Sequence, residues 1–445
     1  MCNITGGGVP TTCRLRRKAA VRVVYLHQYF LTPAQAGGVR SFHVATALAR
    51  RGHDVHVVTA TPPVDAVPLG RRGAVGDEVH DGVTVHRVAV DYDAAMGDRR
   101  RIVAFLAFAL RSSRLARSLR GDVVVATSTP LTIAVPGIAA TLLRRAPLVF
   151  EVRDSWPEVP IAMGALRHPV LRASARLLER LAYASSSTVV ALSPDMADSV
   201  VRTGHPRGRT VVVPNMSDLE RFDPARARPE AFTGRHPRLL GRRLAVYCGT
   251  FGRANGLDHL VDVAVELDRQ GHDLVVVLLG AGAEKEAVRE RARRLGVLDR
   301  SLVVLDAVAK ADLPDVLAAS TIALSSFADV PALRANSANK YFDALAAARP
   351  VAVTIGGWQA EALVETGAGL QLDRDPGRAA RALADFVDDA AGLRRAGQAA
   401  RRLAEERYAQ PLLVARLCDV VERDAASAAS RSGRRRRRGR GAGRG

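Results

Sequence analysis

Short apolar runs alternate with longer amphipathic stretches along most of the chain, and this alternation constrains the fold more than any other feature. In the first half the runs are continuous and rich in valine, which is typical of strands buried on both faces of a sheet. They cover residues 21–26, 54–60, 122–127, 147–152, 187–192 and 210–213. Strands separated by helix-length segments predict a parallel sheet with right-handed crossovers.

The alternation stops after the sixth run and then restarts. Residues 223–242 are rich in Pro, Arg and Gly, which predicts a linker. New strand-like runs follow at residues 244–248, 273–279, 301–305, 321–325 and 350–354. We therefore expect an α/β protein of two Rossmann-like, doubly wound domains, residues 21–222 and residues 243–400. A long amphipathic pattern at residues 401–427 predicts a helix that closes the second domain.

The two ends of the chain carry much of its positive charge. The formal net charge is +20, and the segments 14–18 and 431–445 carry twelve Arg and Lys residues, which leaves about +8 for the rest. Residues 1–20 and 428–445 contain too little apolar surface to fold, so we expect both to be disordered. The remaining charge suits anionic small molecules or an anionic membrane as well as nucleic acid, and we expect no specific nucleic-acid partner.

The cysteines and the apolar segments bear on the compartment. The four cysteines, Cys2, Cys13, Cys248 and Cys418, are scattered without metal-ligand spacing, which is typical of reduced cysteines in a cytoplasmic protein. The first twenty residues lack the apolar core of a signal peptide. No run approaches the roughly 18 to 20 apolar residues that cross a bilayer. We expect a cytoplasmic protein that touches a membrane, if at all, from its surface.

Two such domains in tandem place the carboxyl ends of two sheets opposite one another. Ligands of open α/β sheets bind at that edge, so the cleft between the domains is the expected site. This argument predicts where the site lies but not which reaction it performs.

Two glycine-containing loops follow strands of the second domain. In residues 248–257 the loop leads into a helix, whose N–H groups and dipole favour a phosphate near Gly252, and Arg253 offers a planar fork of donors. The next loop repeats the arrangement with Gly280, Gly282 and Glu284. A plain strand-to-helix turn explains the first loop equally well, and close packing requires glycines in the second with or without a ligand.

Residues 336–351 hold the densest set of polar candidates. Asn336, Ser337 and Asn339 lie where a helix is expected to begin, and can either cap it or bind ligand. Lys340 and Asp343 are three residues apart and share one helix face. The cation suits a diphosphate, and the carboxylate suits paired ribose hydroxyls. The alternative is a helix cap with a surface ion pair.

The first domain supplies candidates for the acceptor side of the cleft. They are His27, the loop residues Gly37, Gly38 and Arg40, and the residues Asp154 and Glu158 that follow the strand at 147–152. The glycines permit close backbone approach. Asp154 is the better candidate for orienting an acceptor hydroxyl, whereas His27 is either a donor or a histidine satisfied within the cleft.

A basic and apolar pattern covers residues 99–120. Seven Arg residues alternate there with Ile, Val, Leu and Phe. The pattern predicts either a Rossmann helix with a solvated basic face or a helix that docks on anionic lipid headgroups, at about 1 kcal/mol per cation.

Several of these segments together resemble a retaining glycosyltransferase of the large GT-B family 4. In the second domain they are residues 249–258, 336–351 and 356–361, and in the first they are residues 27–30, 37–38, 150–158, 192–195 and 214–215. The nearest subgroup is that of bacterial O-antigen and capsule transferases resembling L-fucosamine transferases. The resemblance spans roughly residues 21 to 420, in order and with the family's spacing.

The chain departs from the broad family at the donor site. The family's E-x7-E motif ends at Asp343, and its first Glu falls at Ala335. The family's Arg and Lys of the diphosphate loop fall at Thr250 and Asn255. The resemblance therefore implies that Arg253 and Lys340 neutralise the diphosphate, and that Asn336 or Asn339 contacts the donor sugar.

The resemblance also implies a reaction. It is transfer of a sugar, with retention and without a metal or other cofactor, from a nucleotide diphosphate donor that we expect to be UDP-linked. The implied acceptor is a lipid-linked glycan on polyprenyl diphosphate, or a soluble glycan, in surface polysaccharide synthesis. Two Asp-x-Asp strings, at residues 91–93 and 373–375, lie off the expected cleft loops, so no metal site is predicted. The alternatives are a nucleotide-sugar 2-epimerase of the same fold and a basic nucleic-acid-binding protein.

Overall fold

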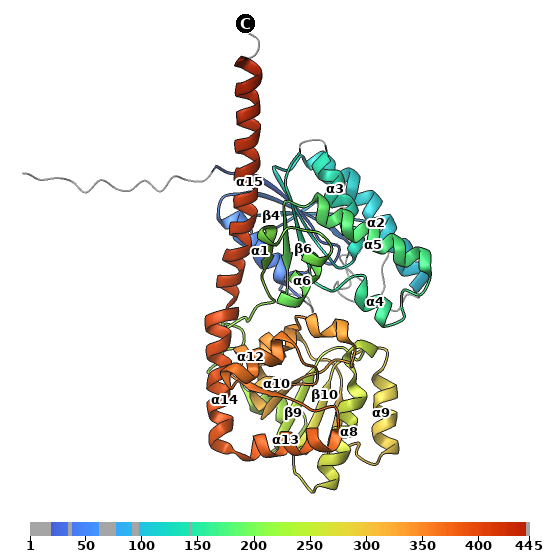
Figure 1. Cartoon of the computed structure of the whole chain (residues 1–445). Helices are drawn as coiled ribbons and strands as arrows, with labels where there is room; N and C mark the ends of the chain where they lie inside the picture. Colours follow the sequence, from blue (N-terminus) through green and yellow to red (C-terminus); the bar gives the residue numbers. More distant parts are fainter. Residues whose placement is uncertain (1–18, 34–37, 62–76, 91–97, 143–144, 442–445) are drawn as a thin grey trace, which may run out of the picture.

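A computed structural model describes residues 19–33, 38–61, 77–90, 98–142 and 145–441 of the chain. Within these ranges two α/β domains stand end to end, and a long C-terminal helix runs along the side of both (Figure 1). The predicted pair of Rossmann-like domains is confirmed.

The first domain is built on a sheet of eight strands in the order β3-β4-β2-β1-β5-β6-β7-β8. All neighbouring strands are parallel except β3, which is antiparallel to β4. The strands are β1 (Arg22–Leu26), β2 (Asp54–Ala60), β3 (Asp77–His80), β4 (Val83–Val88), β5 (Val123–Thr127), β6 (Leu148–Val152), β7 (Thr188–Ala191) and β8 (Thr210–Val212). Every residue of β5 and β6 is buried, as their apolar sequences predict.

Helices cover both faces of this sheet. They are α1 (Arg40–Arg50), α2 (Asp98–Leu119), α3 (Ala134–Leu142), α4 (Glu158–Ala162), α5 (Pro169–Ser185) and α6 (Pro194–Arg202). Helix α3 packs between α2 and α5, so these three form one layer (Figure 1). Helix α1 lies elsewhere, packed against the C-terminal helix.

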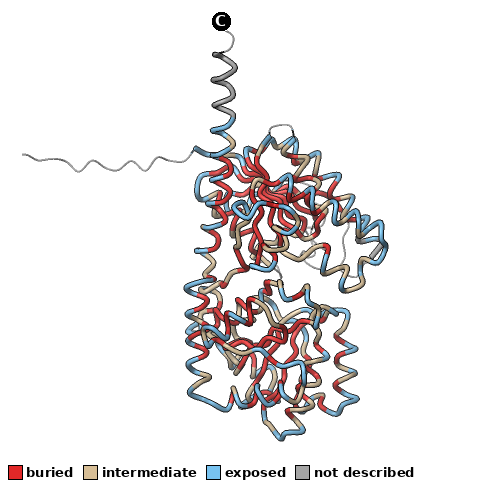
Figure 2. The backbone as a smooth tube through the Cα atoms, in the orientation of Figure 1, coloured by how far each residue is buried: buried red, intermediate tan, exposed pale blue. Residues whose placement is uncertain are grey.

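The second domain repeats the architecture with six parallel strands in the order β11-β10-β9-β12-β13-β14. The strands are β9 (Leu244–Cys248), β10 (Val275–Leu279), β11 (Leu302–Leu305), β12 (Ile322–Ser325), β13 (Val351–Val353) and β14 (Gly369–Gln371). Its helices are α8 (Leu257–Arg269), α9 (Lys285–Arg294), α10 (Leu313–Ala319), α11 (Asn339–Ala346), α12 (Trp358–Thr366), α13 (Pro376–Asp388) and α14 (Ala390–Leu403). Figure 2 shows the strands of both domains as the buried interior.

The chain differs from the sequence prediction between and after the domains. The expected linker 223–242 contains a short helix, α7 (Pro229–Thr233), whose Phe232 is buried against the second domain. The expected closing helix is broken, because α14 gives way to a π-helix (Ala404–Tyr408) before α15 (Gln410–Gly441) begins. Helix α15 continues through residues 428–441, where the composition predicted no structure. The short strands β3, β4 and β14 were not predicted.

Helix α15 returns from the second domain to the first and ties them together. Ser217 N donates to the Tyr408 carbonyl at 2.8 Å, and the Gln410 amide donates back to Ser217 O at 3.0 Å. Further along α15, Glu422 lies 3.2 Å from His53 Nε2. The two domains are therefore joined on the side of the molecule along which this helix runs.

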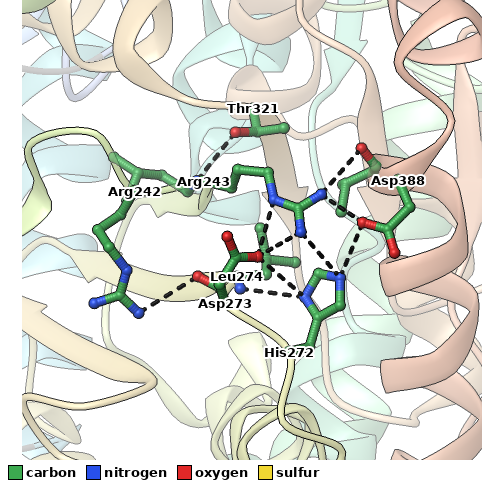
Figure 3. A network of polar contacts seen from close by, with 9 residues as sticks. Arg242, Arg243, His272, Asp273, Leu274, Thr321 and Asp388 are labelled. Carbon is green, nitrogen blue, oxygen red and sulfur yellow. Dashed lines mark hydrogen bonds and ion pairs between the residues drawn. The ribbon is translucent and has the colours of Figure 1, made fainter.

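An ion-pair network closes the amino edge of the second sheet, at the end opposite the cleft (Figure 3). Arg243, which precedes β9, donates to Asp273 before β10 and pairs with Asp388 at the end of α13. His272 Nε2 lies 3.2 Å from the same Asp388. Arg243, His272, Asp273 and Asp388 are thus paired with one another at this edge.

Candidate active site

A cavity of about 570 Å³ opens between the two domains, at the carboxyl ends of both sheets. The first domain contributes His27, Tyr29, Gly38, Thr129, Arg153, Asp154, Leu192 and Asn215, and the second contributes polar residues that include Thr250, Asn255, Lys310, Asn336, Ser337, Asn339, Lys340 and Asp343. The predicted location of the site, between the carboxyl ends of the two sheets, therefore coincides with a cavity lined by both domains.

Lys340 lies in the first turn of α11 with its ammonium among aromatic rings. Its Nζ donates to the Tyr247 hydroxyl at 3.1 Å and lies 4.4 Å from the Tyr247 ring centroid and 5.1 Å from that of Phe327. With its amide turned to satisfy its hydrogen bonds, Asn255 accepts from Nζ at 3.3 Å. Burial lowers the pKa of Lys340 to about 7. No carboxylate in the described part of the chain pairs with it, so an anion in the cavity would hold its charge.

Asp343 lies one turn further along α11 and also lines the cavity. Burial raises its pKa to about 7, against the attraction of Lys310. It forms no ion pair with Lys340 among the contacts that the structure describes, so the surface-pair alternative does not hold. Burial likewise lowers the pKa of Lys310, which lines the same cavity.

His27 and Arg153 face the cavity from the first domain. His27 is buried at the end of β1, and its Nε2 lies 3.4 Å from Arg153 Nη1. Burial, together with the Arg153 charge, holds the pKa of His27 well below its usual value, so the imidazole is neutral. Its Nδ1 has no hydrogen-bond partner among the described residues. A neutral ring of this kind can exchange a hydrogen bond with a substrate hydroxyl.

Gly38 lies between side chains of the two domains. A Cβ atom at this position would lie 3.4 Å from Arg153 Nη2 and 3.5 Å from Asn339 Nδ2. These are ordinary van der Waals distances, so a Cβ atom would fit at Gly38, which lines the cavity, and the predicted close approach of backbone stays a prediction. Gly37 lies outside the described residues.

Asp154 lies where the sequence predicts it, at the carboxyl end of β6 and in the cavity wall. The Thr129 hydroxyl donates to its Oδ2. Asp154 and Asn336 also border a smaller cavity of about 180 Å³, which opens beside Trp156. Glu158 begins α4 with an exposed side chain and does not line the main cavity, so the structure does not support a catalytic role for it.

Arg40 has a structural role in place of the predicted acceptor contact. Its Nε donates to Glu151 Oε1 at 2.8 Å, its Nη2 donates to the Val213 carbonyl at 2.9 Å, and its Nη1 donates to Pro214 O. Burial raises the pKa of Glu151, but Arg40 and Arg153 outweigh this effect and keep it below its usual value. The guanidinium of Arg40 is thus occupied within the fold.

The segment before α11 combines ligand-facing and structural groups. Asn336, Ser337 and Asn339 all line the cavity. The Ser337 hydroxyl, however, accepts from Asn215 N at 3.1 Å, and the Asn215 side chain donates to Ser337 O at 2.6 Å. Ala338 is the residue before the helix, and no side chain caps it. Ser337 therefore links the domains, while Asn336 and Asn339 remain open to a ligand.

The two glycine loops pack against each other behind the cavity. A Cβ atom at Gly280 would overlap the Gly249 carbonyl oxygen, and one at Gly282 would overlap that of Phe251. Glu284 N donates to the same Phe251 carbonyl at 3.0 Å. Of these loops, Gly249, Thr250 and Asn255 line the cavity. Gly280, Gly282 and Glu284 therefore serve packing.

Arg253 and Gly252 are not brought to the cavity. Arg253 lies in a single 3-10 turn with an exposed side chain, and neither residue is among those that line the main cavity. Arg153, Lys310 and Tyr247 line or support the cavity but were missed. Arg153 adjoins the predicted Asp154, so its place after a buried strand was the available signal. The sequence around Lys310 and Tyr247 gave no such signal, because the tertiary fold brings these residues to the cavity.

The described residues contain no group of three or more His, Cys, Asp or Glu side chains that could hold a metal ion. Asp373 and Asp375 lie at the start of α13, where Asp375 caps the helix and Asp373 pairs with Arg378. The string at residues 91–93 lies outside the described residues. The positive groups that line the cavity are the side chains of Arg153, Lys310 and Lys340 and the start of α11.

Both halves of the chain match families of known proteins. Residues 35–216 match the glycosyl transferase 4-like domain, and residues 242–389 match the glycosyl transferases group 1 domain. The glycogen synthase of Mycobacterium tuberculosis is 26% identical over 394 residues, which cover 83% of this chain and 87% of that protein.

Solved structures share the fold. HepE of Anabaena, in complex with UDP and glucose, superposes with a TM-score of 0.67 at 15% identity and covers 90% of this chain and 98% of its own. Sucrose-phosphate synthase of Thermosynechococcus elongatus reaches a TM-score of 0.70 at 14% identity, over 91% of this chain and 99% of its own.

Proposed function

Because the chain is a glycosyltransferase of the GT-B fold and of the family 4 type, we propose that it transfers a sugar from UDP to an acceptor hydroxyl with retention and without a metal. The observation that carries the proposal is Lys340, a cation with a lowered pKa in the first turn of α11, one turn from Asp343. This pair suits a nucleoside diphosphate, because the ammonium neutralises phosphate and the carboxylate accepts hydrogen bonds from ribose hydroxyls.

The donor is oriented by charge. The diphosphate lies against the start of α11 and Lys340, where the helix dipole favours an anion. The ribose lies toward Asp343. Arg153, which reaches the cavity from the first domain, replaces Arg253 as the second cation, because Arg253 is exposed outside it. The residues Asn336 and Asn339 are left for the hydroxyls of the donor sugar.

The reaction needs one bond to break and one to form at the anomeric carbon. The bond between the anomeric carbon and the diphosphate oxygen breaks, and its electrons stay on the leaving diphosphate beside Lys340. The acceptor oxygen, oriented by Asp154, bonds to the same face of the carbon. Its proton passes to the leaving phosphate oxygen. Preorganised cations contribute by stabilising this developing charge. The neutral His27 holds a substrate hydroxyl.

The choice of UDP is supported by a relative of the same fold. HepE was solved with UDP and glucose, and the walls of the present cavity offer an ammonium group for a diphosphate and a carboxylate for a ribose. The acceptor in this proposal is a glycan on polyprenyl diphosphate, as in surface polysaccharide synthesis, and the reaction takes place at the inner face of the plasma membrane. None of the described helices is long and apolar enough to cross a bilayer.

A panel of nucleotide sugars tests the proposal. The purified protein should release UDP from one UDP-sugar when a soluble polyprenyl-diphosphate glycan analogue is added, and the new linkage should keep the anomeric configuration of the donor by NMR. Conversion of the UDP-sugar alone to its C2 epimer would instead identify an epimerase. Inversion of the anomeric configuration would refute the retaining mechanism. Turnover only with another nucleoside diphosphate sugar would refute the choice of UDP.

A further inference from the structure

The outer surface of the α2–α3–α5 layer exposes large aliphatic side chains. We call the following residues the outer helix surface: Val103, Leu106 and Leu110 of α2, Leu142 of α3, and Val170, Leu177 and Leu181 of α5. Val103 is 65% exposed, Leu110 68% and Leu177 57%. These side chains lie outside the core, because each helix buries a different face.

Helix α2 shows this most clearly. Its inward face consists of Ala104, Phe108, Ser112 and Ala116, all buried. The outward residues 103, 106 and 110 fall on the opposite stripe at the spacing of one helix face. A helix on the surface of a globular protein normally presents polar residues there. An aliphatic outward stripe therefore indicates a surface that contacts something less polar than water.

The charges that flank the aliphatic stripes have one sign. Residues 99–121 contain no Asp or Glu, and the only carboxylate of α5, Glu179, is buried. Arg114 and Arg117 of α2 and Arg176 and Arg180 of α5 are exposed, and none forms an ion pair among the described residues. Figure 2 shows the outer sides of these helices as exposed. The surface thus combines aliphatic groups with exposed guanidinium groups, and the carboxylate that attracts Arg176 and Arg180, that of Glu179, is itself buried.

The layer is also placed beside the active site. In a parallel sheet a helix that follows a strand begins at the strand's carboxyl end. The cavity lies at that edge, where His27 and Arg153 end β1 and β6. The first two turns of α2, with Val103, and the first turn of α5, with Val170, therefore lie on the cleft side of the domain.

We propose that the outer helix surface docks on a bilayer of anionic lipids. The aliphatic side chains enter the boundary between headgroups and acyl chains, and the four arginines bind lipid phosphates. A protein partner would need a matching acidic face, whereas an anionic bilayer supplies the apolar and the negative component in one surface. The proposed function explains only why docking is useful, namely that it brings the cleft to a lipid-linked acceptor. The docking itself does not depend on it.

Vesicle flotation tests the docking. The full chain should float with vesicles of phosphatidylglycerol and phosphatidylcholine at about 0.1 M salt and much less with phosphatidylcholine alone. Replacing Val103, Leu106 and Leu110 together by Gln should lower the partition coefficient at least about tenfold. Replacing Arg114, Arg117, Arg176 and Arg180 by Gln should lower it at least about tenfold as well, and should remove the preference for the anionic lipid.

Matched controls keep the result specific. Leu240→Gln and Val364→Gln change side chains of similar exposure, 69% and 67%, on the second domain and should leave partitioning unchanged. A chain ending at residue 431 lacks seven of the eight arginines of the tail and should still depend on the outer helix surface. Unchanged partitioning of both outer-surface variants, equal loss in the controls, or loss of all binding with the tail would overturn the proposal.

UDP binding in solution separates this proposal from the proposed function. All outer-surface variants should bind UDP as the parent does, because none of the changed residues lines the cavity. Loss of vesicle binding with intact UDP binding supports docking, whereas a parent protein that floats but does not bind UDP refutes the donor assignment alone.

Discussion

The two walls of the cavity hold their charges in different ways. In the first domain Arg40 and Glu151 pair within the fold, and Asp154 accepts from Thr129. In the second domain neither Lys340 nor Asp343 forms an ion pair among the described residues, although Lys340 donates to the Tyr247 hydroxyl, and burial moves the pKa of each to about 7. We infer that the charges of Arg40 and Glu151 on the first wall are satisfied within the fold of the free protein, whereas the counter-charge of Lys340 on the second wall would come from a ligand.

This difference has a consequence for stability as a function of pH. Asp343 has a raised pKa, so its contribution is favourable at low pH and is lost as the pH rises from its unfolded value toward about 7. Lys340 has a lowered pKa, so its contribution is favourable above about 10.5 and is lost as the pH falls toward about 7. Near neutral pH both groups therefore destabilise the free protein, which ligand binding should relieve.

The largest effect on stability is expected when the Arg40–Glu151 ion pair of the first wall is removed. Arg40→Met should lower the free energy of unfolding by about 3 to 5 kcal/mol, because it leaves the buried Glu151 without its partner. Chemical denaturation measures this loss. The matched control is Arg22→Met, which breaks an ion pair with Asp54 whose side chains are about half exposed, and it should cost less than about 1 kcal/mol. Equal losses in the two variants would contradict the assignment of Arg40 to the fold.

On the second wall, Lys340→Met should lower activity but raise stability. Catalytic turnover should fall by about 10² to 10³, because a charge that stabilises the leaving diphosphate is lost. The Tm of the free protein at pH 6 should nevertheless rise by about 2 °C or more, because a buried unpaired charge is removed.

The control for Lys340 is Lys285→Met. The Lys285 ammonium pairs with Asp306 and does not line the cavity, so turnover should be unchanged. A fall in Tm for Lys340→Met, or equal turnover in both variants, would show that Lys340 stabilises the fold instead of binding the donor.

Asp343→Asn should affect the donor side less strongly. It replaces one acceptor oxygen by a donor and should lower kcat/KM by about 2 kcal/mol, or roughly thirtyfold. In the parent, kcat/KM should be highest near pH 7, because it rises as the Asp343 carboxyl group ionises and falls as Lys340 loses its proton, and the rising limb should be absent in the variant. Near-normal kinetics would move the ribose away from α11.

Arg253→Ala should have the smallest effect. Its side chain is exposed outside the cavity, so UDP affinity should change by less than about 1 kcal/mol in a calorimetric titration. A loss comparable with that of Lys340→Met would mean that the loop at residues 249–256 closes over the diphosphate.

The sequence predicted the fold well because buried parallel strands have an unmistakable composition. Runs such as residues 123–127 and 275–279 are apolar on both faces, and no other common structure requires that. Strands β3, β4 and β14 were missed because their sequences lack such a continuous run. Strand β3 has no buried residue, β4 mixes buried with half-buried residues, and β14 has no buried residue.

The site was predicted in part. Lys340, Asp343, Asp154 and Gly38 line the cavity, because each lies next to the end of a strand or the start of a helix, and the topology places those positions at the cleft. Their roles stay predictions. Arg40 and Arg253 were misassigned, because sequence spacing does not show which way a side chain points or which buried partner takes it. The Arg40 guanidinium donates to Glu151, which lies 111 residues away in the chain.

The most direct test of the donor wall is calorimetric titration of UDP in excess EDTA. The parent protein should bind UDP without a divalent metal, and at pH 8 it should take up protons on binding, because the diphosphate raises the pKa of Lys340 from about 7. Titrations in buffers of different ionisation enthalpy measure this proton uptake. Lys340→Met should abolish the uptake and weaken UDP binding at least about tenfold. Binding that requires a divalent metal, or that takes up no protons, would contradict the account.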